Sequence, residues 1–358
     1  MTNLIGQSLG RYHILEQLGE GGMATVYKAY DTRLETDVAV KIIRTENILP
    51  SVLERSLKRF EREAKSLARL THPNIVKVTD YGEFEGKPYL VMPYLPGGTL
   101  KERIKQGPIP WQDAVRLLLP IAQALEYAHE QNLIHRDVKP SNILLTSKGQ
   151  PMLTDFGVAK LFDMEATADL TGTGMGVGTP EYMAPEQWQG QVSVQTDVYA
   201  LGVVLYEMVT GRRPYTADTP AAVLIKQTTN PLPMPSNFVP GLPDSVEKVL
   251  LKALSKNPVE RYQTIKNMAD ATEGLILHSH SIGSSQYNQP VQNQPTETWQ
   301  HSQPIQHQPT AKNGNQKQLV GIIMGIMGGV LLCFAILVWV DITSQWCTFF
   351  PFLVEGCK

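Results

Sequence analysis

The segment HRDVKPSN, residues 135–142, carries much of the information in this sequence. It brings a carboxylate, an ammonium group and a carboxamide close together along the chain, at Asp137, Lys139 and Asn142. Any one of these side chains alone is weak evidence for chemistry, because Asp and Asn commonly cap turns. The segment therefore has to be interpreted together with the polar motifs that precede and follow it.

A glycine-rich segment, LGEGGMATV at residues 18–26, lies upstream between two predicted strands. Backbone N–H groups at Gly19, Gly21 and Gly22 can approach phosphate oxygens because no Cβ intervenes. Alone this signal is weak, since a hairpin turn also uses glycine wherever φ is positive. The strand-loop-strand setting argues against a dinucleotide fold, in which the glycines open a helix.

Three further motifs occur in order, VAVK at 38–41, DFG at 155–157 and APE at 184–186. Together with HRDVKPSN they resemble the eukaryotic-like (Hanks-type) Ser/Thr protein kinases, most closely the bacterial membrane-anchored type, over about residues 10–277. The resemblance implies an α+β, bilobal protein kinase fold, with a small antiparallel-sheet lobe that carries one helix and a larger helical lobe.

The hydrophobic periodicity agrees with two lobes, at about residues 10–95 and 96–277. Short β-branched runs, broken by Gly and Asp, predict the small sheet. Apolar residues at three- and four-residue spacing predict one helix over 54–70 within it. The second lobe is predicted to be mostly helical, with helices at 111–131, 195–210, 220–228, 244–255 and 264–277.

The resemblance assigns the phosphoryl-transfer chemistry to a few residues. Asp137 is implied to be the catalytic carboxylate, which accepts or orients the proton of the substrate hydroxyl. Lys139 is implied to neutralise the γ-phosphate, which indicates Ser/Thr rather than Tyr specificity. Asn142 and Asp155 are implied to hold Mg²⁺, with Mn²⁺ as a substitute, since oxygen ligands suit hard cations.

Lys41 is implied to reach the α- and β-phosphates of ATP, and a carboxylate must hold it in place. By the register of the motif we expect Glu63, on the predicted helix, to be that carboxylate. Glu61 is the competing choice, two residues away on another face of the helix.

Adenine requires apolar surfaces on its two faces, and the resemblance supplies them, although each such residue is also compatible with ordinary core packing. Two positions depart from the family pattern. Pro93 stands where many relatives have Glu, which removes one backbone donor, and Ala24 replaces the usual third glycine. The residues expected to contact ATP are Leu18, Gly19, Glu20, Gly21, Gly22, Val26, Ala39, Lys41, Met92, Pro93, Leu95, Leu144 and Asp155.

The segment between DFG and APE carries candidate regulatory residues. Thr171 and Thr173 match the paired autophosphorylation sites of the family by their distance from GTPE at 178–181. Arg136, directly before the expected catalytic carboxylate, can bind a phosphothreonine through charge-assisted hydrogen bonds. Thr179 is expected to position the substrate.

Other residues are expected to hold the motifs in place. Glu186 is expected to pair with Arg261, and Asp197 to brace the catalytic loop. The structural set implied by the resemblance is Arg136, Phe156, Gly157, Glu186, Asp197 and Arg261.

The composition excludes some partners. With 32 Lys+Arg against 34 Asp+Glu, the chain has no uniform basic field for binding nucleic acid. The three cysteines lie at 333, 347 and 357, so the long N-terminal part cannot hold a disulfide and suits a reducing compartment. The N-terminus lacks a basic start followed by an apolar run, and we expect no cleavable signal peptide.

The C-terminal part changes in character near residue 278. Residues 278–318 contain 10 Gln, 4 Asn, 4 Pro and 4 His, which predicts a flexible linker. Residues 319–340 are 22 uncharged residues, about 33 Å as a helix, and predict one membrane span. Lys312 and Lys317 precede the span, so we expect the kinase domain to be cytoplasmic, the chain to be single-pass in the plasma membrane and the tail, 341–358, to lie outside.

Two features of this region remain open as sequence hypotheses. Gly321, Gly325 and Gly329 recur at every fourth position and permit close approach of a second helix, so homodimerisation through this stripe or through the kinase domain is one option. Cys347 and Cys357 lie in the expected external tail, and their pairing as a disulfide is a second option.

These observations favour a membrane-anchored protein Ser/Thr kinase that uses Mg-ATP, acts on protein substrates including its own activation segment, and contacts membrane lipid through 319–340. A catalytically inactive kinase-like scaffold is the alternative from another class, but the set of polar motifs is unbroken. A small-molecule kinase is the other alternative, and the APE and GTPE segments favour a protein substrate instead. The sequence identifies neither the physiological substrates nor the stimulus.

Overall fold

The computed structural model of the chain describes residues 4–22, 24–45, 50–156 and 179–284. All of them lie in the first of two compact units, Met1–Gln289. The expected membrane span at 319–340 and the tail that follows it lie outside the described residues. Among the helices of the described part, none combines the length and hydropathy of a membrane-crossing segment.

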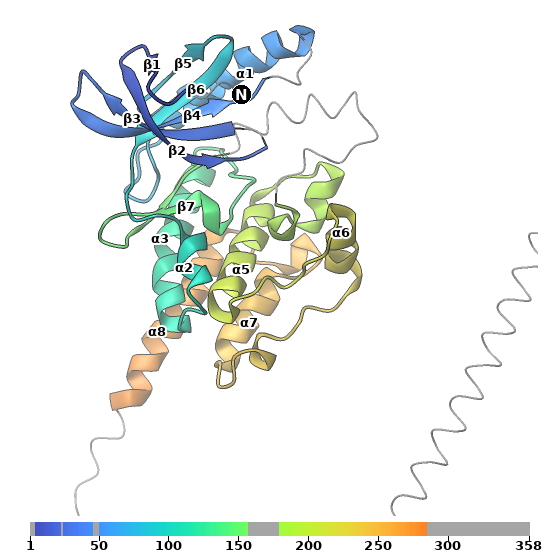
Figure 1. Ribbon diagram of the computed structural model, residues 1–358. Coiled ribbons are helices and arrows are strands. Elements are labelled where there is room, and N and C mark those ends of the chain that lie inside the picture. The colour runs from blue at the N-terminus through green and yellow to red at the C-terminus, as the bar shows by residue number, and fades with distance from the viewer. Residues whose placement is uncertain (1–3, 23, 46–49, 157–178, 285–358) are drawn as a thin grey trace, which may run out of the picture. The chain divides into compact units, whose positions relative to one another are not determined.

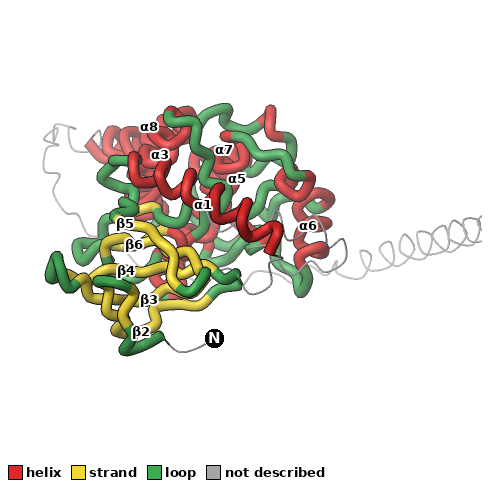
Figure 2. The backbone as a smooth tube through the Cα atoms, turned by 90° about the horizontal axis from the view of Figure 1, so that it is seen from above, coloured by secondary structure: helices red, strands yellow, loops and turns green. Residues whose placement is uncertain are grey.

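The N-terminal lobe is an antiparallel sheet of six strands in the order β1-β2-β3-β4-β6-β5. Burial along β3 and β4 follows the pleat, because β-branched and aromatic residues alternate with polar ones. Figure 2 shows β2, β3, β4, β6 and β5 side by side in this order. The strands are β1 Ser8–Leu9, β2 Tyr12–Glu20, β3 Ala24–Asp31, β4 Thr36–Ile43, β5 Asp80–Phe84 and β6 Lys87–Pro93.

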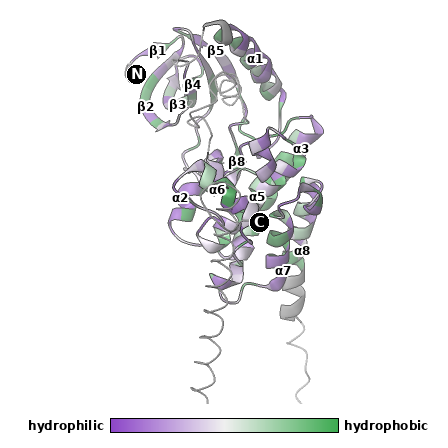
Figure 3. Ribbon diagram, turned by 90° about the vertical axis from the view of Figure 1, so that its right-hand side faces the viewer, coloured by the Kyte–Doolittle hydropathy of each residue, from purple (hydrophilic) through white to green (hydrophobic). Residues whose placement is uncertain are grey.

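Helix α1, Pro50–Arg69, is the one helix described between the strands of this lobe. Phe60, Ala64 and Leu67 are buried along one stripe of it, as their three- and four-residue spacing predicts. The helix contacts β5 and β6, and its ribbon in Figure 3 carries hydrophilic as well as hydrophobic residues. The lobe therefore matches the predicted small sheet with one helix.

The C-terminal lobe is mainly helical, and Figure 1 shows it below the sheet. Helix α5 is buried on almost every side, since every residue from Thr196 to Tyr206 is buried, and α3, α7 and α8 pack around it. The helices are α2 Leu100–Lys105, α3 Trp111–Glu130, α5 Val194–Thr210, α6 Pro220–Thr229, α7 Asp244–Ala253 and α8 Ile265–Ser284. Helix α8 extends past residue 277, so the start of the expected linker is helical.

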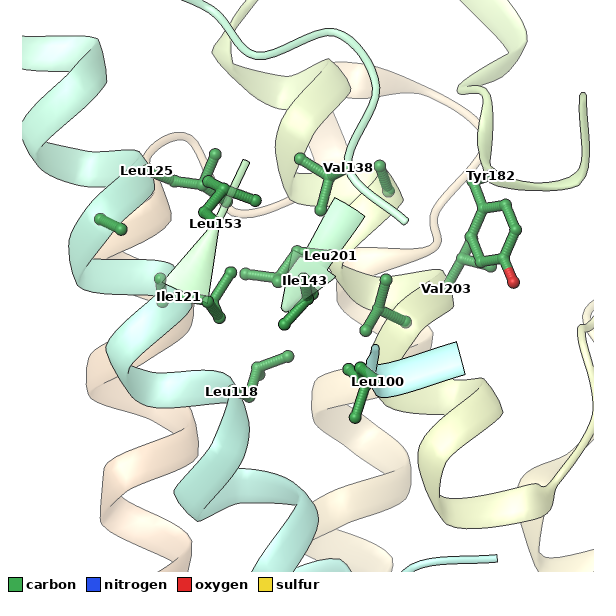
Figure 4. Packing of buried hydrophobic residues seen from close by; sticks show 14 of the residues in the cluster. Leu100, Leu118, Ile121, Leu125, Val138, Ile143, Leu153, Tyr182, Leu201 and Val203 are labelled. Carbon is green, nitrogen blue, oxygen red and sulfur yellow. The ribbon is translucent and has the colours of Figure 1, made fainter. Parts of the chain in front are cut away.

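The segment HRDVKPSN is anchored by one apolar side chain in its middle, Val138, and by another directly after it, Ile143. Figure 4 shows Val138 and Ile143 packed near Leu118 and Ile121 of α3 and Leu201 of α5. Each of these five side chains is at most 1% exposed. Truncating such a residue costs about 2–5 kcal/mol, so the two helices fix the position of the polar residues next to these side chains.

A short hairpin, β7 Ile143–Leu145 with β8 Pro151–Leu153, joins the two lobes. The N–H of Val76, just after α1, donates to the Leu153 carbonyl at 2.8 Å. The N–H of Leu145 donates to the Gly98 carbonyl at 2.9 Å, next to the segment that leaves β6. The residues that follow β8 are therefore held between the lobes, and the predicted bilobal architecture is confirmed.

Candidate active site

The three polar side chains of the loop after α3 meet at one carboxylate. Lys139 Nζ lies 2.8 Å from Oδ2 of Asp137. Asn142 Nδ2 donates to the same oxygen at 3.0 Å and to the Asp137 carbonyl at 2.8 Å. The Asp137 and Lys139 side chains are 19% and 17% exposed, so the pair is partly shielded from water while remaining accessible. This is a carboxylate held ready to accept a proton beside a cation.

A second carboxylate, Asp197 at the start of α5, holds the backbone of this loop. Its side chain is 0% exposed. Oδ2 accepts the N–H of His135 at 2.8 Å and Oδ1 accepts the N–H of Arg136 at 2.9 Å. Oδ2 also lies 2.8 Å from Nε2 of His129 on α3. Because Arg136 has a positive φ of 67°, the two N–H groups can point to one carboxylate.

The imidazole of His135 connects the loop to the residues after β8. Its Nε2 lies 2.9 Å from the carbonyl oxygen of Thr154, and its ring centroid lies 4.5 Å from that of Phe156. Burial lowers the pKa of His135, so the ring is neutral at neutral pH and donates to Thr154. Phe156 is buried in the core cluster that extends into both lobes.

Lys41 on β4 forms an ion pair with Asp155, with 2.8 Å between Nζ and Oδ1. Asp155 has a positive φ of 65°, uncommon for a residue other than glycine. Glu63 is half-buried on α1, and among the described residues Lys41 has no ion pair with it. Glu61, the alternative, is exposed and pairs instead with Lys65 on its own helix at 2.6 Å. The structure thus brings Lys41 to Asp155 but does not bring it to Glu63.

The glycines between β2 and β3 are not explained by the hairpin itself. None of Gly19, Gly21 and Gly22 has a positive φ. Among the described residues, a Cβ at Gly19 or Gly22 would meet no atom within 4 Å, and one at Gly21 would meet the carbonyl of Ala24 at 3.7 Å. The alternative explanation, that the hairpin turn needs glycine for a positive φ, is therefore wrong at these three positions. The open space next to the strands suits the close approach of an anionic ligand.

The apolar residues expected around adenine come from both lobes. Ala39 and Met92 pair across β4 and β6 and are 7% and 6% exposed. Leu18 is 42% exposed at the end of β2, and Pro93 is exposed at the end of β6. Three more residues are only partly buried against the same core cluster, namely Val26, Leu95 and Leu144.

The Glu186 and Arg261 side chains form a buried, bidentate ion pair. The two N–O distances are 2.7 and 2.9 Å, and the arginine side chain is 0% exposed. The guanidinium group also donates to the carbonyls of Ser255, Gln195 and Lys256. All its donors are thus satisfied, which is the condition for a buried charge to be tolerated.

A pocket of about 280 Å³ adjoins the catalytic loop. Thr179 and Lys139 both line it, so the threonine expected to position the substrate lies close to the expected site of chemistry. The other expected residues of this region, Gly157, Thr171 and Thr173, lie outside the described residues. The pocket also includes four charged residues to which no sequence motif pointed, two from α2 and two from the end of α5 and the turn after it: Lys101, Lys105, Glu207 and Arg213.

One wall of this pocket is formed by Tyr182, Glu207 and Arg213, whose polar groups already bind other groups of the protein. The hydroxyl of Tyr182 donates to Glu207, and burial raises the pKa of that carboxyl. Arg213 pairs with Glu181 at 2.5 Å. In the sequence, these residues are isolated charges near the end of α5 and near the APE segment. No motif links them, so the sequence did not predict these contacts.

The fold and the site together define a class. Three features occur together: a hairpin with glycines, the ion pair between Lys41 on β4 and Asp155 after β8, and a loop in which Lys139 and Asn142 contact Asp137. This combination is the arrangement of a protein kinase. A model of the protein kinase domain family matches residues 12–272, and the chain belongs to this family.

The relatives are bacterial Ser/Thr kinases. The chain is 42% identical to the probable serine/threonine-protein kinase CPE1738 of Clostridium perfringens, covering 76% of this chain and 39% of that protein. It is 39% identical to the serine/threonine-protein kinase PrkC of Bacillus subtilis, covering 74% and 40%. The PknI kinase domain of Mycobacterium tuberculosis has a similar fold, with a TM-score of 0.61 at 27% identity, covering 77% of this chain and 100% of that one. The chain thus spans about two fifths of the length of these two curated relatives.

Proposed function

We propose that this chain transfers the γ-phosphoryl group of Mg-ATP to Ser or Thr hydroxyls of proteins, its own activation segment included. The observation that carries the proposal is the convergence on Asp137, whose Oδ2 lies 2.8 Å from the Lys139 ammonium and 3.0 Å from the Asn142 amide. A carboxylate in that setting can take the hydroxyl proton while the adjacent ammonium offsets phosphate charge.

The residues present fit ATP and a divalent cation. The open space next to Gly19 and Gly22 leaves room for phosphates, and the side chains of Asn142 and Asp155 offer oxygen ligands. In the described part of the chain no group of three or more His, Cys, Asp and Glu could hold a metal ion. Mg²⁺ in kinases commonly uses one or two protein carboxylates and the nucleotide phosphates, and when bound it supplies positive charge over those oxygens.

Lys41 has a proposed second partner. Its ammonium pairs with Oδ1 of Asp155, the same carboxylate that we propose as a cation ligand. A cation bound to Asp155 would repel the Lys41 ammonium, which lies 2.8 Å from Oδ1 of that carboxylate. We assign Glu63, half-buried on α1, as the carboxylate that then orients Lys41 toward the phosphates.

The test is a phosphorylation assay with Mg-ATP and a generic basic protein, comparing the chain with Asp137→Asn and Lys41→Met. We expect phosphoserine or phosphothreonine with the wild-type chain and a loss of at least about a hundredfold in both variants, since each removes a group used in the transition state. Equal incorporation in all three would leave a binding scaffold as the function. Phosphorylation of small hydroxyl compounds without protein phosphorylation would favour a small-molecule kinase.

The remaining proposals concern parts of the chain outside the described residues. Residues 319–340 support a single membrane span in the plasma membrane with the kinase domain in the cytoplasm, because they are uncharged and follow Lys312 and Lys317. The span would contact lipid, and its glycine stripe supports homodimerisation. Thr171 and Thr173 are the proposed autophosphorylation sites.

A further inference from the structure

The tip of the hairpin between β2 and β3 is weakly fixed by the core of the lobe. Every residue of β2 from Leu15 to Glu20 is exposed, so core packing does little to hold this end of the strand. The turn is closed by a backbone hydrogen bond from the N–H of Gly21 to the Ala24 carbonyl, at 2.9 Å. Glycine loses more conformational freedom on ordering than any other residue, so the segment needs a further restraint if its N–H groups are to hold phosphates.

The carboxylate of Glu20 supplies such a restraint. One of its oxygens forms an ion pair with Arg44, the residue directly after β4, and the other accepts Nε2 of Gln17 at 3.1 Å. Arg44 also donates to Oγ1 of Thr25 at 3.4 Å, and Thr25 is only 2% exposed. Hydrogen bonds from Arg44 and Gln17 lower the pKa of Glu20, so its carboxylate is charged at neutral pH. The contacts among these four residues are called the hairpin clamp.

The hairpin clamp lies on the face of the sheet opposite to the expected nucleotide. Val26 packs against the core cluster of Ala39 and Met92, on the adenine side. Its neighbour Thr25 lies on the other face, where it lines a small cavity beside Tyr27 of the second core cluster. Glu20 is paired directly with Thr25 across the hairpin, and residues paired in this way share a face. The Glu20 side chain therefore acts on the hairpin and not on the nucleotide itself.

The other end of the hairpin clamp is attached to the most firmly held part of the sheet. Strand β4 pairs with β3 on one side and with β6 on the other, and Arg44 follows its last residue. Lys41, which is expected to reach the α- and β-phosphates, belongs to the same strand. The ion pair between Glu20 and Arg44 thus fixes the glycine segment relative to the strand that carries Lys41.

We propose that Glu20 and Arg44 are positioning residues for ATP, because their ion pair holds the N–H groups of the glycine segment where the phosphates bind. The part of the ligand that responds to them is the phosphate chain and not the base. The side chains of Glu20 and Arg44 are 54% and 25% exposed, so water and salt can compete for this ion pair and the hairpin can open for nucleotide exchange. This inference rests on the proposed kinase activity and names residues that control its nucleotide binding.

The experiment measures the equilibrium binding of Mg-ADP and of adenosine to the full chain. The variants are Glu20→Gln, Arg44→Gln and the two changes together. We expect each to weaken ADP binding by about two- to fivefold, with the double variant close to the single ones, since either change removes the same contact. Adenosine has no phosphate, so we expect its affinity to stay the same. The control Glu54→Gln breaks a surface ion pair with Lys58 on α1, and we expect it to leave both affinities unchanged.

The direction of the change in Glu20→Gln separates positioning from a simple effect of charge. If the two side chains acted only through their electric field, loss of the carboxylate would tighten ADP binding and loss of the guanidinium group would weaken it.

The inference is overturned by tighter or unchanged ADP binding in Glu20→Gln, by unchanged ADP binding in Arg44→Gln, or by an equal loss of ADP and adenosine affinity, which marks general damage to the lobe. If the wild-type chain binds Mg-ADP and phosphorylates protein, any of these results refutes only the hairpin clamp. A wild-type chain that neither binds Mg-ADP nor phosphorylates protein refutes the proposed function and the clamp with it.

Discussion

Replacing Asp197 by asparagine tests whether a buried carboxylate under the catalytic loop controls the position of Asp137. The wild-type carboxylate accepts two backbone N–H groups, from His135 and Arg136, and contacts Nε2 of His129. Asparagine keeps the shape but has only one acceptor oxygen. Whichever way its amide turns, at least one backbone N–H then faces an NH₂ group in a place that water does not reach.

The size of the effect follows from these contacts. A hydrogen bond to an ionised group contributes about 1.5–3 kcal/mol, and a buried donor left without an acceptor adds a penalty of about 1–3 kcal/mol. We therefore expect Asp197→Asn to lose about 3–5 kcal/mol of unfolding free energy. For a folded part of about 280 residues the unfolding entropy is about 0.6 kcal/mol per degree, so the melting temperature falls by about 5–8 °C.

The assay combines thermal unfolding with steady-state phosphorylation. A displacement of the reacting carboxylate by about 1 Å costs about a hundredfold in rate, so we expect kcat to fall by about ten- to a hundredfold while KM for ATP changes little. The control is His129→Leu, which removes one side-chain contact and leaves both backbone N–H groups bound to Asp197, and we expect kcat within about threefold of wild type. A variant Asp197→Asn with unchanged melting temperature and unchanged kcat would refute the reasoning.

Two further predictions use the glycines and the buried histidine. Gly22→Ala is expected to leave the melting temperature unchanged and to raise KM for ATP, because within the described part of the chain no atom that the new Cβ would meet lies within 4 Å. Gly97→Ala is expected to destabilise the fold, since its Cβ would lie 2.4 Å from the Leu145 carbonyl oxygen. An equal loss of melting temperature in both variants would contradict this. Burial lowers the pKa of His135 below its value of 6.5 in the unfolded chain, so the unfolded state binds more protons as pH falls and stability decreases below about pH 6.5, by at most about 1.4 kcal/mol per pH unit. In His135→Tyr that part of the slope is expected to disappear when urea unfolding is compared between pH 5 and pH 7.5, and an identical slope in both proteins would argue against a neutral His135.

Much of the fold was predictable from local patterns. The helices expected at 111–131 and 195–210 correspond to α3 and α5, because their apolar spacing and their flanking Pro and Gly residues are local signals. The helix expected to end at 277 continues to Ser284. The change in composition near residue 278 shows where the apolar residues of the helix end, but a helix can continue beyond its last apolar residue.

The candidate site was predictable where a motif keeps its residues adjacent. Asp137, Lys139 and Asn142 lie within one loop, so their convergence follows from the chain itself. The partner of Lys41 did not follow in this way, because it depends on where α1 lies relative to the sheet, and the structure pairs Lys41 with Asp155.

The order of the motifs, the glycines next to the strands and the apolar spacing of the helices were thus enough to establish the kinase family and its two lobes. Tertiary structure alone established which charges are neutralised and which stay available. Lys101 lies about a hundred residues from Glu207 and Arg213 in sequence, and the three meet at one pocket only because α2, α5 and the catalytic loop pack together. Electrostatic interactions act through space, so a net charge at a site is a property of the assembled fold and not of any segment within it.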